Sequence, residues 1–176
     1  TAKYLRRLGV EVDIHLGSTQ IDYSRYDLLH VFNIIRPADI LPHLLKSGKP
    51  YVVSTIFVDF TEYEHYHRHG LTSLITRNLS TDKLEYLKTI ARWLKNGHTK
   101  PGLNYLMRGH REAVKQIASG ASLLLPNSES EYKRFAAHYG IHAPYKVIYN
   151  GIDPALFNNR TTDLKRNENL VLCVAR

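Results

Sequence analysis

Apolar and polar residues alternate along this chain with two different periods, which predict strands and helices in turn. Val10 to Leu16 (VEVDIHL) changes between apolar and polar at almost every step, as in a strand with one buried face. Ser128 and Glu131 have the spacing of a helix capping box, and Gly140 follows where that helix should end. Over the whole chain the patterns predict strands at 10–16, 26–32, 51–55, 122–125, 146–149 and 170–175, helices at 2–8, 37–46 and 128–139, and a long helical region at 62–119.

Strands separated by helices predict an α/β fold, a Rossmann-like parallel sheet flanked by helices, because parallel neighbours need a crossover between them. We expect this sheet to lack its first strand, since the short opening helix has no strand before it. The chain is therefore expected to be a fragment. In open parallel sheets, ligands bind beyond the carboxyl ends of the strands. That rule selects the segments 33–36, 55–60, 127–129 and 150–153 as the candidate binding edge.

The net charge of +8 is concentrated in one stretch of the chain. Residues 76–116 hold nine Lys/Arg and three Asp/Glu, whereas residues 1–75 hold eight of each. A local basic face favours an anionic partner, which is nucleic acid, an acidic lipid surface or a phosphorylated substrate. The single cysteine, Cys173, cannot form an internal disulfide. We therefore expect a cytoplasmic protein, either free or peripheral at the inner face of the membrane.

The string from Tyr145 to Phe157 (YKVIYNGIDPALF) carries the most specific signal in the chain. Its apolar run ends at Asn150-Gly151, residues that tolerate positive φ, and Asp153 is suited to cap a short helix that opens with Pro154. This string resembles the interdomain hinge of GT-B glycosyltransferases of the family-4-like group (glycosyl transferases group 1). Four earlier blocks resemble the N-terminal half of that family in the same order: AKYLRRLGVEVDI from Ala2, YDLLHVFN from Tyr26, GKPYVVST from Gly48 and ASLLLPNSE from Ala121.

The resemblance implies three regions. Residues 1–150 would form an N-terminally truncated Rossmann-like acceptor-binding domain, residues 151–169 a hinge or linker, and residues 170–176 the first strand of a C-terminal nucleotide-sugar-binding domain. Asn150, Gly151 and Asp153 would be the hinge residues. One departure from the family concerns a His that many members carry shortly after the strand matching 51–55: this chain has TIFVD at 55–59 there, so no His aligns with it, and Asp59 is the polar residue in that segment.

The resemblance also implies an activity, a hexosyltransferase that moves a sugar from a nucleotide-sugar to an acceptor hydroxyl with retention, in polysaccharide or glycolipid biosynthesis. The implied acceptor is a saccharide or a lipid-linked acceptor. The nucleotide-sugar is a co-substrate held mainly by the C-terminal domain, and no other cofactor is implied. We therefore expect this chain to be inactive by itself.

Residues at the predicted strand ends are the candidate acceptor contacts, and several have a purely structural alternative. Asp59 is a weak candidate for a catalytic group, or else a helix cap or turn carboxylate. A turn Asn and a surface Arg are the favoured alternatives for Asn33 and Arg36, and a simple helix cap is favoured for Ser128. His30 is interpreted as a satisfied core histidine. The full candidate set is Asn33, Arg36, Thr55, Phe57, Asp59, Asn127 and Ser128.

The segment 83–95 (KLEYLKTIARWLK) predicts an amphipathic helix. Its apolar face is expected to pack on the sheet, and this face comprises Leu84, Leu87, Ile90, Ala91 and Leu94. The alternative is a helix at an anionic membrane surface, for which the membrane-facing candidates are Lys83, Lys88, Arg92, Trp93 and Lys95. His65, His67 and His69 are better explained by an exposed polar helix than by a metal site, so no metal is expected.

Two other functions stay open on the sequence. A non-catalytic basic module for nucleic acid would fit the basic stretch and the twelve tyrosines. The tyrosines are scattered and no nucleic-acid motif is present, so no nucleic-acid partner is expected. A nucleotide-sugar epimerase would keep the GT-B fold and change the chemistry, but the hinge string favours the transferase.

Overall fold

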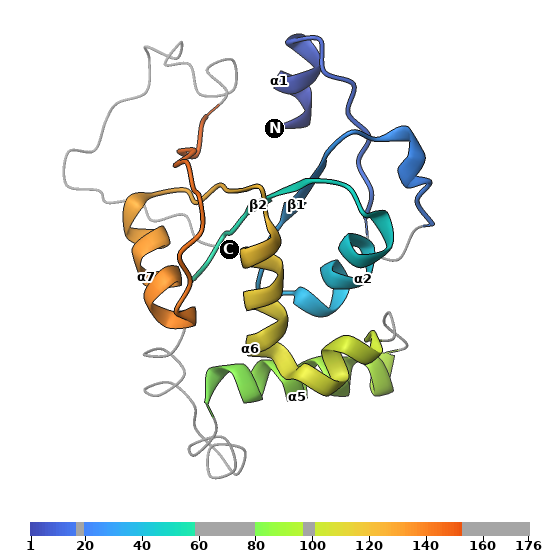
Figure 1. Cartoon of the computed structure of the whole chain (residues 1–176), viewed down its shortest axis with the longest axis vertical. Coiled ribbons are helices and arrows are strands. Elements are labelled where there is room, and N and C mark those ends of the chain that lie inside the picture. The colour runs from blue at the N-terminus through green and yellow to red at the C-terminus, as the bar shows by residue number, and fades with distance from the viewer. Residues whose placement is uncertain (17–19, 59–79, 97–100, 153–176) are drawn as a thin grey trace, which may run out of the picture.

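The computed structural model describes residues 1–16, 20–58, 80–96 and 101–152 (Figure 1). Three parallel strands form one sheet in the order β1 (Leu29–Phe32), β2 (Tyr51–Ser54) and β3 (Leu123–Leu124). Val53 lies level with Val31 on one side and with Leu124 on the other. This small parallel sheet flanked by helices confirms the predicted α/β class.

The helices begin and end largely where the sequence predicts. They are α1 (Ala2–Arg7), the short 3-10 helix η1 (Tyr23–Arg25), α2 (Pro37–Ser47), α5 (Thr81–Asn96), α6 (Leu103–Gly120) and α7 (Glu129–Tyr139). Gly48 ends α2 with φ of 60°, and Gly140 ends α7 with φ of 67°. Both values lie in the left-handed region that glycine adopts without steric cost.

The core lies between the sheet and the helices α2, α6 and α7. Figure 1 shows α6 crossing in front of the strands, with α2 on one side of it and α7 on the other. Val53, Leu124 and Ile117 are fully buried there. The Tyr51 hydroxyl donates to the Ile117 carbonyl at 2.9 Å and so joins β2 to α6. A Cβ at Gly120 would lie 2.5 Å from that hydroxyl, so this position needs glycine for close approach.

The strand predicted at 10–16 is wrong. This segment forms no strand, and Val10, Ile14 and Leu16 are 47%, 64% and 80% exposed. A strand needs a neighbour to take its backbone hydrogen bonds, and no described strand pairs with this segment. It is held instead by Arg6, whose guanidinium donates to the Val12 carbonyl.

The strand predicted at 146–149 is present only as an extended segment. Tyr145 forms an isolated parallel bridge with Leu124, and Lys146 N–H donates to the Leu124 carbonyl at 2.9 Å. Ile148 N–H then donates to the Pro126 carbonyl, also at 2.9 Å. The chain therefore runs beside β3 in the same direction, and it continues to the exposed Asn150 and Gly151 without further regular structure.

The prediction that the whole apolar face of α5 packs on the sheet is wrong. Leu84 is buried, but Leu87 is 50% and Leu94 is 71% exposed. The helix packs on α6 through another arc, where Asp82 pairs with Arg111 at 2.9 Å and the Tyr86 hydroxyl donates to the Leu106 carbonyl at 3.0 Å. These ionic and aromatic contacts lie on the side of the helix that faces α6, whereas Leu87 and Leu94 are turned outward.

The predicted long helical region is divided. Within the described residues it consists of α5 and α6, and α6 itself contains a kink at Gly109, with φ of 80° and ψ of 178°. The hypotheses on Asp59, on His65, His67 and His69, on Asp153 and on the strand at 170–175 all fall outside the described residues. No helix in the described ranges is both long enough and apolar enough to cross a membrane.

Candidate functional site

The carboxyl ends of the three strands lie along one edge of the sheet because all three strands are parallel. We call this the carboxyl edge. Asn33 N–H donates to the Ser54 carbonyl at 3.0 Å, and Ile34 N–H donates to the Thr55 carbonyl at 3.2 Å, so the ladder continues past β1 and β2. Neighbouring strands are about 4.8 Å apart, which brings the segments after β1, β2 and β3 within about 10 Å. The structure therefore brings three of the four predicted segments together.

Two non-glycine residues at this edge have a positive φ. Asn33 directly follows β1 with φ of 69°, and Ile56 follows β2 with φ of 46°. Asparagine tolerates this region, whereas a β-branched residue there is a genuine outlier. Asn33 Oδ1 is also buried without a hydrogen-bond partner among the described residues. Strained backbone and an unsatisfied polar atom are typical of binding sites, where surrounding contacts hold them in place.

The carboxylate of Glu131, in α7, binds backbone and side-chain donors at the carboxyl edge. Its side chain is buried, and Oε1 accepts hydrogen bonds from the Thr55 hydroxyl and from Phe57 N–H, the latter at 2.8 Å. Its Oε2 accepts from Asn127 N–H at 2.7 Å. One carboxylate therefore joins the segment after β2 to the segment after β3. Three donors on a buried carboxylate satisfy it without a basic partner.

Glu131 is a residue whose role the sequence reasoning missed. The Ser128–Glu131 spacing predicted a capping box, and half of that box is present, since Ser128 Oγ accepts from Glu131 N–H at 3.1 Å. This confirms Ser128 as a helix cap. The carboxylate, however, does not return to the Ser128 backbone but reaches the carboxyl edge. A glutamate three residues after a cap is consistent with both arrangements, and only the tertiary contacts decide between them.

Two of the candidate acceptor residues lie in the interior. Thr55 is 1% exposed and its hydroxyl is bound to Glu131. Phe57 is 7% exposed and its ring packs edge-on against Phe135 at 5.4 Å between centroids. These side chains hold the edge in shape, and a ligand would meet the backbone and the exposed side chain of Ile56 between them.

The remaining candidates face solvent to different degrees. Arg36 is the N-cap residue of α2 and is exposed, with its guanidinium 3.9 Å from the Asp39 carboxylate. Asn127 is half-buried, and its backbone N–H is held by the Glu131 carboxylate. His30 donates to or accepts from Ser54 Oγ at 2.9 Å, and burial lowers the pKa of its imidazole, as expected for a satisfied and neutral histidine. One guanidinium and neutral amides suit a ligand rich in hydroxyl groups or one that carries a phosphate.

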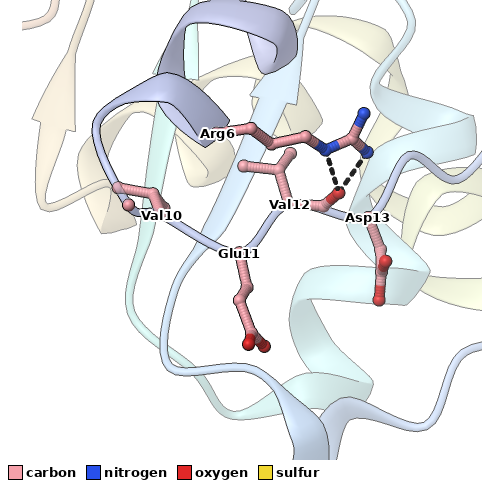
Figure 2. A pocket seen from close by; sticks show the side chains of 6 residues that line it. Arg6, Val10, Glu11, Val12 and Asp13 are labelled. Atoms are coloured by element: carbon pink, nitrogen blue, oxygen red, sulfur yellow. Dashed lines mark hydrogen bonds between the residues drawn. The ribbon is translucent and has the colours of Figure 1, made fainter.

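A separate hollow lies beside α1 and involves only residues 6–13. It is lined by Arg6, Gly9, Val10, Glu11, Val12 and Asp13, and no candidate acceptor residue contributes to it. Figure 2 shows Arg6 turned back onto the Val12 carbonyl while the carboxylates of Glu11 and Asp13 point away from it. The Arg6 guanidinium thus serves the local backbone, and the candidate site is the carboxyl edge.

Comparisons of the chain with protein-family models, with curated proteins and with solved structures each gave no match. The assignment of a function therefore depends on the residues and contacts described above.

Proposed function

We propose that this chain is the acceptor-binding domain of a glycosyltransferase that transfers a sugar from a nucleotide-sugar to an acceptor hydroxyl. The observation that carries the proposal is the carboxyl edge, where Glu131 fixes the segments after β2 and β3 beside the strained Asn33 and Ile56. The hinge-like string supports it, because its segment 145–148 runs beside β3 in the direction of the parallel strands and is followed closely by Asn150-Gly151.

In this proposal the edge positions the acceptor. Arg36 and Asn127 would bind hydroxyl or phosphate groups of the acceptor, since Arg36 is exposed, Asn127 is only half-buried, and the backbone N–H of each is hydrogen-bonded. Rigid positioning of one reactant supplies much of the advantage of a two-substrate enzyme. The donor and the charge on its leaving phosphate would be handled by the proposed C-terminal domain, so the 176-residue chain alone should not turn over.

The test uses the full-length protein of which we propose this chain is a part. Nucleotide release would be measured with a panel of nucleotide-sugars and saccharide acceptors. Arg36→Ala and Asn127→Ala should raise the acceptor KM with little change in the donor KM. Arg134→Ala, an exposed change on α7, is the matched control.

Three results would contradict the proposal. The first is unchanged acceptor KM in both variants, and the second is turnover by the 176-residue chain alone at the rate of the full-length protein. The third is a donor sugar that changes configuration without transfer, which would indicate an epimerase. A salt-dependent shift of RNA or DNA in a gel, without nucleotide release, would favour the nucleic-acid module instead.

A further inference from the structure

The exposed face of α5 carries an apolar line. Leu87, Ala91 and Leu94 are spaced by four and three residues and therefore lie along one side of the helix. All three are exposed, and Leu94 is 71% accessible. We call these three residues the α5 stripe. The apolar pattern predicted that this side of the helix would pack on the sheet, but in the structure it is exposed.

The opposite arc of α5 already holds the helix in place. Asp82 pairs with Arg111 at 2.9 Å, and the Tyr86 ring stacks on Tyr105 with centroids 5.5 Å apart. Figure 1 shows α5 below α6, on the side of it away from β1 and β2. The helix is therefore anchored by this arc and by the buried Leu84, whereas the three residues of the α5 stripe are left exposed.

The charges around the stripe are positive. Lys83 and Lys95 are exposed and form no ion pair in the part of the chain that the structure describes. Both acidic residues of the helix are already paired: Asp82 with Arg111 at 2.9 Å, and Glu85 with Lys88 at 2.6 Å and Arg92 at 3.7 Å. Residues 76–116 hold nine basic and three acidic residues, so an acidic partner is favoured along this whole region.

The start of α6 has the same character. Leu103 and Met107 are one turn apart, 76% and 86% exposed, and followed by the exposed Arg108. Exposed leucine and methionine beside lysine and arginine are typical of helices that lie at a lipid interface, with the apolar side chains below the head groups. Nucleic-acid surfaces use aromatic platforms, and no aromatic residue belongs to the stripe.

We propose that the α5 stripe docks on an anionic membrane surface, with Leu87 and Leu94 inserted between head groups and Lys83 and Lys95 against lipid phosphates. This revises the candidate set from the sequence. Lys88 and Arg92 are engaged with Glu85, and Trp93 is half-buried, so the leucines and the two outer lysines carry the interaction. The proposal is independent of the sugar chemistry and requires only the folded chain.

Vesicle sedimentation tests it directly. The chain should pellet with vesicles that contain phosphatidylglycerol and remain in solution with phosphatidylcholine alone. Leu87→Ser with Leu94→Ser should weaken binding by about tenfold or more, because the inserted side chains supply the apolar part of the affinity. Leu45→Ser, at a 55% exposed leucine of α2, should bind like the wild type. Lys83→Gln with Lys95→Gln should weaken binding and reduce its dependence on salt.

Equal binding to neutral vesicles, no binding to either kind, or unchanged binding after the leucine changes would each overturn the proposal. Binding of RNA that needs the two lysines but not the leucines, without vesicle binding, would overturn it in favour of nucleic acid.

Discussion

Removal of the Glu131 carboxylate should destabilise the carboxyl edge more than any other single polar change there. Glu131→Ala leaves the Thr55 hydroxyl, Phe57 N–H and Asn127 N–H without their acceptor. A hydrogen bond to a charged group contributes about 1.5–3 kcal/mol, and the three are not additive. We therefore expect a loss of about 3–5 kcal/mol in the free energy of unfolding, against a total of about 5–15 kcal/mol for a typical domain.

Glu131→Gln separates the lost charge from the lost side chain. Its carbonyl oxygen can keep the bonds to Thr55 and Phe57, but its NH₂ group then faces Asn127 N–H, donor against donor. The expected loss is smaller, about 1–3 kcal/mol. Urea unfolding measures both variants, and hydrogen exchange at the Phe57 and Asn127 amides should accelerate before global unfolding.

Glu129→Gln is the matched control for Glu131. Glu129 is also acidic, lies in the same first turn of α7 and is exposed, with one contact to the Tyr145 hydroxyl at 3.0 Å. It therefore reports the helix-dipole effect together with one exposed hydrogen bond, for which we expect less than about 1 kcal/mol. A Glu131→Ala variant within about 1 kcal/mol of the wild type, or one no weaker than the control, would refute the role assigned to this carboxylate.

Two further predictions concern α6. Gly109→Ala should lower the free energy of unfolding by about 1–3 kcal/mol, because φ of 80° with ψ of 178° is almost restricted to glycine. Urea titration measures this loss. Ser119→Ala, at an exposed position of the same helix, is the control and should be nearly neutral. Burial lowers the pKa of His110, so the unfolded chain binds the proton more readily, and stability should fall as the pH drops below about 6.5. His110→Asn should lose less stability between neutral and mildly acidic pH than the wild type, and parallel losses in both proteins would contradict this account.

The fold class and most helix ends were predictable because they depend on local chemistry. Ser128 supplies a cap acceptor, and Gly48 and Gly140 supply a left-handed φ, so α2 and α7 are signalled within a few residues of their ends. The strand at 10–16 was not predictable in this way. Alternation shows only that a segment is suited to a sheet, and whether it pairs depends on a neighbour elsewhere in the chain.

The candidate site was predictable as a place and not as a set of contacts. The rule for parallel sheets selected the segments at 33–36, 55–60 and 127–129, and the structure brings them together. The same rule does not distinguish a side chain that faces solvent from one that points inward, and Thr55 and Phe57 point inward. For α5, five apolar residues predicted one face, but the structure turns Leu87 and Leu94 outward and places the Asp82–Arg111 pair and the stacked Tyr86 and Tyr105 rings between α5 and α6, contacts whose partners lie outside the helix.

The positive φ of Ile56 follows from the position of Glu131. Thr55 and Phe57 lie on either side of Ile56, and both donate to the same oxygen, Oε1. A side-chain hydroxyl and a backbone N–H two residues apart can reach one point when the chain curls around that point, and the left-handed φ of Ile56 supplies the curl here. The conformational cost, of order 1–3 kcal/mol, is offset by two bonds to a buried carboxylate. The strained φ of Ile56 is therefore maintained by the Glu131 carboxylate of α7. The side chain of Ile56 is exposed at the carboxyl edge because the residues on both sides of it are bound to that carboxylate.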